Sequence, residues 1–301
     1  MKMRKFSRWN LRKQEKLTGA VFITPTLLCL LAVVLIPLVY SLIISFSDYS
    51  FLRPIISEFR GWENFRMAFE DQYFWNSLLV TLKFVVIVVS FEFVIGFAIA
   101  LLLNREIKFK GIYYAILTIP MVMSPVAVGL IWKMLLHPEL GVINWVLSLV
   151  GIPPVNWLGT TSGAIWTIVF VDIWHQVSFM ILVLLAGLVS LPNEPFQAAK
   201  IDGANSLQIL FKITIPLMRP VIATALLIRT IMAFRTYDLV YVMTKGGPGV
   251  STDVLSYFIY KKTFMGLDLA QASAISWVLL VIVLLMVLVL FKFMRTDEEV
   301  A

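Results

Sequence analysis

Charged residues, cysteine and histidine are all scarce in this chain of 301 residues. Only 14% of the residues are charged and 60% are hydrophobic, whereas an average soluble domain has about 25% charged residues. The single cysteine, Cys29, excludes an internal disulfide, and there is no Cys/His cluster of the kind that holds a metal. The composition indicates a chain that uses membrane lipid as the solvent for much of its surface.

A phosphate-binding loop is missing too. The string Gly-x-x-x-x-Gly-Lys-Ser/Thr, in which backbone N–H groups and the lysine hold phosphates, occurs nowhere. The two histidines, His137 and His175, support no Ser-His-Asp set. We expect a subunit that is not an enzyme and binds no cofactor itself. The net charge of +7 is explained by basic loops on the cytoplasmic side of a membrane, so no nucleic acid is expected as a partner.

Long apolar runs are abundant. A helix needs roughly 20 mostly apolar residues to cross a bilayer, and in lipid its backbone groups must be bonded internally. The sequence predicts an all-α polytopic membrane protein with prolines that kink its spans, at Pro25, Pro37, Pro120 and Pro125. We expect six transmembrane helices, near residues 20–46, 76–103, 111–136, 163–190, 217–243 and 270–294.

The basic residues indicate how the chain is oriented. They gather before the first span, in the second and fourth connections and after the last span, whereas the third connection, 137–162, has no lysine or arginine. The first apolar run is too long for a secretory signal. We therefore expect a basic cytoplasmic segment at 1–19, a membrane domain at 20–294 and a cytoplasmic tail at 295–301. The lysines of the fifth connection, Lys245, Lys261 and Lys262, fit this orientation less well.

A polar segment, EPFQAAKIDGANSLQILFKITIPLMRP, separates the fourth and fifth spans. Asn193 can cap a first short helix, and Gly203 can end it with a positive φ. Ser206 or Asn205 can cap a second helix, and Pro216 would start the next span. These residues predict a helix–turn–helix along the cytoplasmic face, which is either an interfacial linker or a docking element for another protein.

The same segment resembles the EAA loop of binding-protein-dependent ABC importers. That family has Glu-Ala-Ala, three residues, Gly, nine residues, then Ile-x-Leu-Pro. This chain keeps the spacing, with Gln197-Ala198-Ala199, Gly203 and Ile213-Thr214-Ile215-Pro216. Gln197 replaces the family's glutamate, which removes a charge, and Ile215 replaces the leucine.

The resemblance extends over residues 20–294 and is to maltose and glycerol-3-phosphate type sugar permeases. It is carried by the Gly-Gly-Pro outer loop at 244–248, by GIPPVNWLG at 151–159 and by FVDIWHQVSFMILVLLAGLVSLP at 170–192. It implies the permease subunit of a type I ABC importer in a bacterial inner membrane. It also implies a heterodimer with a second permease, two cytoplasmic ATPase subunits that bind ATP and Mg, and an extracytoplasmic solute-binding protein that delivers a sugar.

The resemblance also points to particular residues. The ATPase would dock on the loop at 194–220, at Gln197, Ala198, Ala199, Asp202, Gly203, Ile213 and Pro216. The sugar would bind between the fourth and fifth spans, where the candidates are Asp172, His175, Gln176, Met232, Arg235 and Thr236. The outer surface formed by 47–75, 141–159 and 246–262 would receive the binding protein, and 141–159 has the spacing of an interfacial helix.

Charged side chains within spans are costly and suggest a pathway or a site. Asp172, His175 and Gln176 share one helix face because they are spaced i, i+3, i+4. Two interpretations of Arg229 and Arg235 stay open. In the first, the arginines have a structural role, either in an ion pair with Asp172 or Asp238 or by snorkelling to an interface. In the second, they recognise an anionic group on the substrate. For Lys83 and Lys133 we favour a structural role.

Other functions are also compatible with parts of the sequence. An ion-coupled secondary transporter would use Glu92 and Asp172 as carriers, but it gives no account of the cytoplasmic helix–turn–helix. A membrane scaffold would leave the charges inside the spans unexplained. Within the importers, an anionic sugar derivative or glycerol phosphate is an alternative to a neutral sugar.

Overall fold

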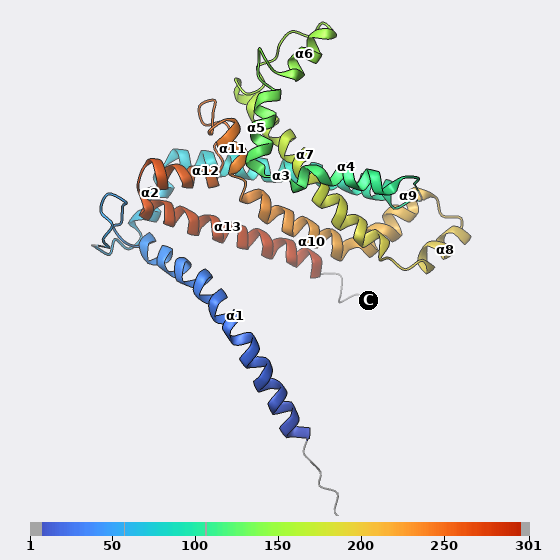
Figure 1. Ribbon diagram of the computed structural model, residues 1–301, viewed down its shortest axis with the longest axis horizontal. Coiled ribbons are helices and arrows are strands. Elements are labelled where there is room, and N and C mark those ends of the chain that lie inside the picture. Colours follow the sequence, from blue (N-terminus) through green and yellow to red (C-terminus); the bar gives the residue numbers. More distant parts are fainter. Residues whose placement is uncertain (1–7, 57, 106, 296–301) are drawn as a thin grey trace, which may run out of the picture.

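The computed structural model of the protein describes residues 8–56, 58–105 and 107–295. Helices are its regular elements throughout that range (Figure 1). They are α1 (Arg8–Ser45), α2 (Glu63–Glu70), α3 (Gln72–Leu103), α4 (Lys110–Val122), α5 (Pro125–Leu135), α6 (Val142–Leu149), α7 (Thr161–Val189), α8 (Glu194–Ile201), α9 (Ser206–Ile209), α10 (Ile215–Phe234), α11 (Asp238–Met243), α12 (Leu255–Tyr260) and α13 (Leu269–Arg295). Residues 1–7 of the predicted basic segment and 296–301 of the predicted tail lie outside the described residues, whereas residues 8–19 form the start of α1.

Five helical segments of the described chain are long and apolar enough to cross a membrane, and a sixth span requires α4 and α5 to be counted together. These two helices bend by 97° at the break between them. The expected span at 111–136 is thus a broken one, and the break falls at Pro125, one of the prolines at which a kink was predicted, because proline cannot continue the hydrogen bonding of α4. By contrast, α1 runs through Pro25 and Pro37 as one helix.

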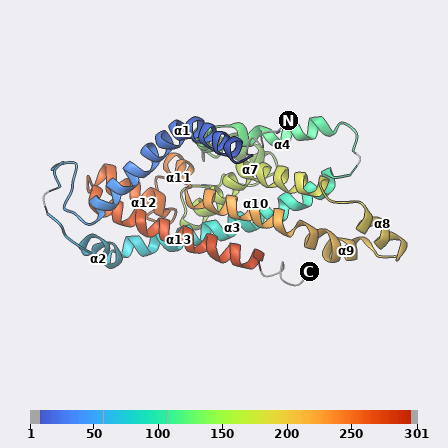
Figure 2. The same ribbon diagram turned by 90° about the horizontal axis from the view of Figure 1, so that it is seen from below.

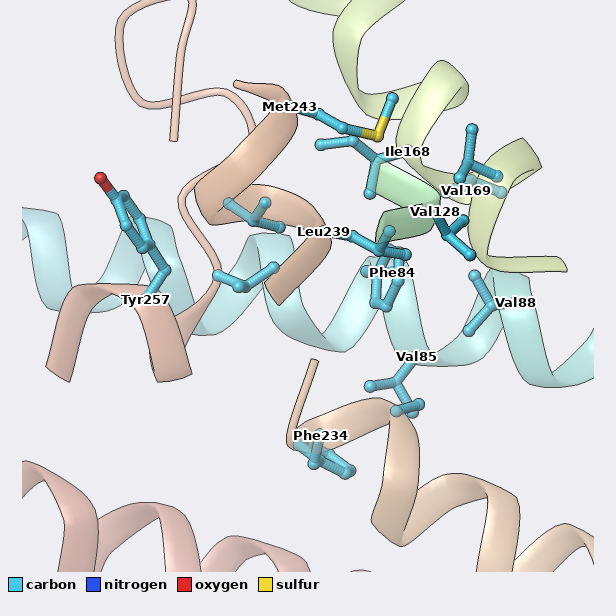
Figure 3. Packing of buried hydrophobic residues seen from close by; sticks show 14 of the residues in the cluster. Phe84, Val85, Val88, Val128, Ile168, Val169, Phe234, Leu239, Met243 and Tyr257 are labelled. Carbon is cyan, nitrogen blue, oxygen red and sulfur yellow. The ribbon is translucent and has the colours of Figure 1, made fainter. Parts of the chain in front are cut away.

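The body of the molecule is a bundle in which α7 lies against α3, α4 and α10, and α13 covers α10 (Figures 1 and 2). Figure 3 shows Phe84 of α3, Ile168 of α7, Phe234 of α10 and Leu239 of α11 meeting in one apolar cluster. A second apolar cluster joins α3, α7 and α10 further along the bundle. A Cβ at Gly187 would lie 2.7 Å from Val221 Cγ1 of α10, so a larger residue there would require the side chains of α10 to shift.

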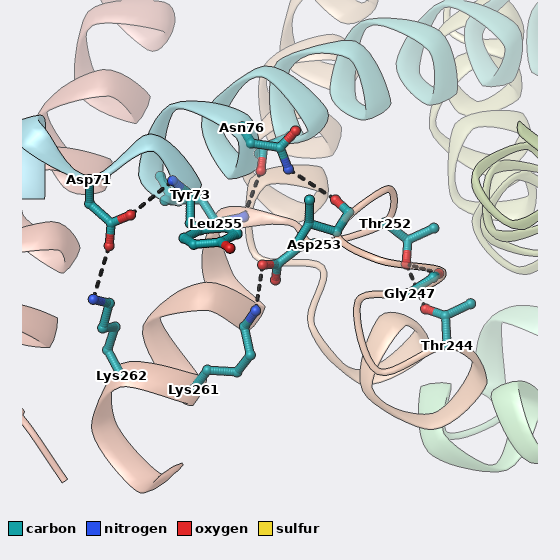
Figure 4. Close-up of polar contacts among 12 residues, drawn as sticks. Asp71, Tyr73, Asn76, Thr244, Gly247, Thr252, Asp253, Leu255, Lys261 and Lys262 are labelled. Atoms are coloured by element: carbon teal, nitrogen blue, oxygen red, sulfur yellow. Dashed lines mark hydrogen bonds and ion pairs between the residues drawn. The ribbon is translucent and has the colours of Figure 1, made fainter. Parts of the chain in front are cut away.

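The two ends of the bundle carry different connecting segments. The α8–α9 end contains the basic connection that precedes α4, and the α2–α12 end contains the fifth connection (Figures 1 and 2). At the α2–α12 end, Lys261 pairs with Asp253 and Lys262 Nζ lies 3.0 Å from Asp71 Oδ2 (Figure 4). These two lysines are neutralised by acidic partners, which explains why they departed from the charge pattern of the sequence.

The N-terminal helix leaves the bundle. Figure 1 shows α1 diverging from the other helices, and it meets α13 near its C-terminal end, where Ile44 is buried. Most of its apolar side chains are exposed. Such a surface suits lipid or another membrane chain and not water.

Candidate functional site

The helical path between α10 and α11 is interrupted. α10 ends at Phe234, and α11 begins only at Asp238. The Thr236 carbonyl, which lies in the interruption, accepts a hydrogen bond from the Ser256 hydroxyl. The expected span at 217–243 falls within the apolar segment 206–243, and the structure adds an interruption of its helix at 235–237. Irregular backbone at membrane depth is tolerated where protein buries it or where it lines a cavity.

A cavity of about 210 Å³ lies at this break. All six residues predicted to bind substrate line it, and the structure therefore brings them together. Tyr237 and Asp238 also line it, although the sequence analysis did not select them as site residues and considered Asp238 only as an ion-pair partner. The complete lining consists of Pro125, Asp172, His175, Gln176, Arg229, Met232, Arg235, Thr236, Tyr237, Asp238 and Leu239.

One wall of the cavity is a buried ion cluster. Arg229 of α10 donates from Nη2 to Glu92 Oε1 of α3 at 2.8 Å, and from Nε to the second oxygen of the same carboxylate. Arg229 Nη2 also donates to Asp172 of α7. The three side chains are at most 5% exposed. A bidentate pair of this kind is strong and has defined geometry, so the cluster ties three helices together.

This cluster decides between the interpretations of Arg229. It pairs with Asp172, as one interpretation expected, and also with Glu92, whose partner the sequence analysis did not identify. The sequence contained a signal for this pairing, because a glutamate in the middle of an apolar run needs a partner in the bundle. Arg235 is exposed at the cavity and has no ion pair within residues 8–56, 58–105 and 107–295, so a site built from two free arginines is not present.

His175 and Gln176 hold the bend between α4 and α5. His175 Nε2 lies 3.1 Å from the carbonyl oxygen of Met123, a residue in that bend, and Gln176 Nε2 lies 3.0 Å from His175 Nδ1. Both contacts are satisfied if Nε2–H donates to Met123 and Nδ1 accepts from Gln176. Ser178 donates to the Leu117 carbonyl in the same region. The polar face of α7 therefore satisfies backbone groups of the broken span as well as lining the cavity.

The two lysines for which we favoured a structural role lie on the outside of the bundle. Lys83 is exposed on α3. Lys133 is also exposed, and its Nζ donates to the Val242 carbonyl at 3.0 Å, at the end of α11. A lysine there satisfies one of the carbonyl groups that a helix end leaves without a partner.

The polar segment between α7 and α10 has the predicted helix–turn–helix. α8 is followed by Gly203 with φ +75°. Asn205 Oδ1 accepts from Gln208 N at 2.9 Å, and Gln208 Oε1 accepts from Asn205 N at 2.8 Å. The reciprocal pair fixes the start of α9. A Cβ at Gly203 would meet nothing within 4 Å, so the turn requires glycine for its backbone conformation and not for space.

Two details of that prediction are wrong. Asn193 makes no side-chain cap to α8, because its own backbone is already helical. Pro216 does not start a separate span, because α9, a π-helical turn over Leu210–Thr214 and α10 follow one another without interruption. The wider turn ahead of Pro216 accommodates a residue that lacks an N–H and crowds the preceding turn.

The predicted docking residues do not all face outward. Gln197, Ala198, Asp202 and Gly203 are exposed, whereas Ala199 is buried and Ile213 and Pro216 are half-buried. Three apolar side chains that were not selected from the sequence are exposed on the same segment: Ile201, at 86%, Leu207 and Phe211. Large apolar residues in a polar loop are the signal that identifies them.

Comparison with known proteins places this geometry in a family. Residues 92–296 match the family described as "Binding-protein-dependent transport system inner membrane component". The trehalose/maltose transport system permease protein MalF of Thermococcus litoralis is 36% identical over 96% of this chain and 97% of its own length. The sn-glycerol-3-phosphate transport system permease protein UgpA of Pectobacterium atrosepticum is 32% identical over 79% of this chain and 81% of its own length.

A solved structure has the same fold. It is the bacterial alginate ABC transporter in complex with an alginate pentasaccharide-bound periplasmic protein, and one of its chains superposes with a TM-score of 0.81 at 26% identity. The alignment covers 96% of this chain and 97% of that one. The family match spans more than half of the chain, and the multiple apolar helices agree with it. This chain belongs to the inner membrane components of binding-protein-dependent transport systems and is a non-catalytic, multi-pass permease subunit of an ABC importer.

Proposed function

We propose that this subunit carries a sugar or sugar derivative across a bacterial inner membrane through the cavity at the α10–α11 break. The observation that carries the proposal is a polar cavity inside a broken span, lined by side chains from α7 and α10. Relatives named for trehalose, maltose and glycerol-3-phosphate transport support this class of substrate. Family membership speaks against the ion-coupled and scaffold alternatives.

The lining suits a sugar because it offers both kinds of contact that a sugar needs. Gln176, Thr236 and Asp238 supply hydrogen-bonding groups, while Met232 and Tyr237 supply apolar faces. Arg235 supplies a charged donor at the exposed side of the cavity. Asp172 and His175, although they line the cavity, are engaged by Arg229 and Met123. We assign these two side chains to positioning the site.

The loop at 194–220, which begins with the helix–turn–helix, is the proposed docking surface for an ATPase subunit. Its exposed apolar side chains, Ile201, Leu207 and Phe211, would be covered in that contact. The α8–α9 end would then be cytoplasmic, together with both termini. A second permease would complete a heterodimer, and each permease would receive one of the two ATPases, which bind ATP and Mg.

Motion of the docking surface has a direct route to the cavity. The helix from Ser206 to Phe234 is uninterrupted and ends at the break. At 1.5 Å per residue it is roughly 40 Å long. A rigid-body shift of α9 with its ATPase would therefore move Met232 and Arg235 relative to α7. That difference between two states is what allows ATP to change the affinity for the substrate.

The opposite end of the bundle is the proposed docking surface for the solute-binding protein. The sequence analysis expected this surface to comprise 47–75, 141–159 and 246–262. In the structure α2 and α12 lie at this end, whereas α6, within 141–159, lies on an arm that projects from the side of the bundle (Figure 1). The solved alginate transporter, whose complex contains a periplasmic protein, supports such a contact. Photo-crosslinking residues at Val150 and Lys245, both exposed, should capture the binding protein, and the same residues at Phe109, near the other end, should not.

Uptake by the reconstituted complex tests the proposal. Liposomes containing both permeases and the ATPases would receive the binding protein outside, ATP inside and one labelled probe at a time. The probes are maltose, trehalose, an alginate pentasaccharide and glycerol 3-phosphate. ATP-dependent uptake of any saccharide supports the proposal, and uptake of glycerol 3-phosphate alone would favour an anionic substrate at Arg235. Uptake of none, with an active ATPase, would contradict the carbohydrate assignment.

A further inference from the structure

A row of aromatic rings leads from the α2–α12 end of the bundle to the cavity. The Phe51 and Phe264 ring centroids lie 6.4 Å apart, those of Phe264 and Tyr260 5.1 Å apart, and those of Tyr260 and Tyr237 5.0 Å apart. Tyr241 stacks on Tyr237 with centroids at 5.4 Å. Tyr237 is itself a wall of the cavity. The row thus connects the end proposed to receive the binding protein with the proposed sugar site.

These rings are not an ordinary core cluster. Phe51 is 43% exposed and Phe264 is 60% exposed, whereas Tyr257, which packs beside Tyr237 and Tyr260, is only 2% exposed. Tyr241 is exposed as well. A ring that served packing alone would bury its faces as Tyr257 does. The row keeps aromatic surface open at Phe51, Phe264 and Tyr241, while Tyr237 and Tyr260 are half-buried.

The outer part of the row is held in place by backbone contacts. Phe51 N donates to the Leu267 carbonyl at 3.1 Å, and Ser50 Oγ donates to the same carbonyl at 2.8 Å. This carbonyl lies just after the turn that carries Phe264. The connection between α1 and α2 is thereby fixed against the segment that follows α12, so Phe51 and Phe264 belong to one surface although they are far apart in sequence.

Two lysines beside the row are neutralised by acidic partners. Lys261 is paired with Asp253, and Lys262 is paired with Asp71 (Figure 4). Open ring faces suit a ligand with C–H faces and a polar perimeter, which is the character of a carbohydrate ring. Aromatic side chains give large contact area with little loss of side-chain freedom, and many equivalent faces allow a ligand to move along them.

We propose that Phe51, Phe264, Tyr260, Tyr237 and Tyr241 form an aromatic path along which a saccharide moves from its binding protein to the cavity. The inference rests on the proposed function, because it requires that a carbohydrate is the substrate. It adds a route and a set of residues that the cavity alone does not contain. Phe51 and Phe264 have no part in lining the cavity, so they test the path separately from the site.

The test uses the reconstituted complex and the saccharide probe that the wild type transports best. Phe264→Ala and Tyr260→Ala should each lower the uptake rate roughly three- to tenfold, the scale of one aromatic contact. ATP hydrolysis without binding protein should stay at the wild-type rate. Phe264→Tyr and Tyr260→Phe keep the ring face and should restore uptake. Phe91→Ala, which removes an exposed ring on α3, is the matched control and should transport normally.

Each outcome distinguishes the path from the site. Wild-type uptake of no saccharide contradicts the proposed function. Wild-type uptake together with unchanged uptake by both alanine variants overturns the path and leaves the function intact. Poor yield of the assembled complex for the alanine variants, or failure of the ring-retaining variants to restore uptake, would show that the rings serve assembly and would also overturn the path.

Discussion

Removing Arg229 should destabilise the subunit strongly, because it leaves two carboxylates buried without their counter-charge. Glu92, Asp172 and Arg229 are all at most 5% exposed. Breaking a buried pair by removing one partner costs about 3–5 kcal/mol. A folded domain is stable by only about 5–15 kcal/mol, so Arg229→Met removes a large share of the total. We expect a lower yield of assembled complex and earlier unfolding in detergent.

The matched control is Arg235→Met. This arginine is on the same helical path, six residues further on, but it is exposed and has no ion pair within the described residues. Its removal should leave thermal stability close to that of the wild type. The comparison separates loss of a buried counter-charge from loss of any arginine near the cavity.

A triple replacement tests the physical cause. Replacing a whole buried ion cluster by apolar residues of similar volume is often neutral or stabilising by about 1–4 kcal/mol. Glu92→Met, Asp172→Leu and Arg229→Met together should therefore recover most of the stability that Arg229→Met alone loses. The measurement is the midpoint of thermal unfolding of the purified complex, followed by size-exclusion chromatography. If Arg229→Met unfolds together with the wild type, the cluster does not hold the three helices and the reasoning is wrong.

Three further predictions concern the docking loop, the cavity and the α2–α12 end. Gly203→Asp should uncouple ATP hydrolysis from uptake, and Gly203→Asn, which tolerates positive φ better, should retain more coupling; equal coupling in both would count against the turn. Gln176→Ala and Thr236→Val should lower uptake about 5–150-fold with normal complex yield, through loss of one buried polar partner. Burial raises the pKa of Asp253, while Lys261 opposes that shift. Folding therefore favours the protonated carboxyl, and in Lys261→Met resistance of 246–262 to proteolysis should fall as pH rises above about 4.

Local chemistry accounts for the features that the sequence predicted well. Gly203 and Asn205 specify the turn and the start of α9 through bonds that reach no more than three residues along the chain. The apolar runs specify spans because lipid requires each backbone group to be bonded within its own helix. The spacing of polar residues on α7 specifies their shared face. Each of these signals is complete within one segment.

Contacts between residues far apart in the sequence decided the features that the sequence did not predict. The sequence places charges at Glu92 and Arg229, but 137 residues separate them, and nothing local selects one partner over another. Pro125 predicted a kink between α4 and α5, but its angle of 97° is accompanied by contacts from α7, including the one from His175 to Met123. The same holds for the aromatic row, which joins Phe51 to Phe264.

By itself, the sequence determined the helical class, four of the spans within a few residues, the helix–turn–helix after α7 and the family through its motif spacing. Only the tertiary structure decided that the helix of the fifth span is interrupted before Asp238 and that a cavity lies there. It also decided that Arg229 pairs with two buried carboxylates, whereas Arg235 stays exposed. The reason is physical: hydrogen bonding and lipid contact act on each helix separately, whereas buried charges and broken backbone need partners that only packing of several helices supplies.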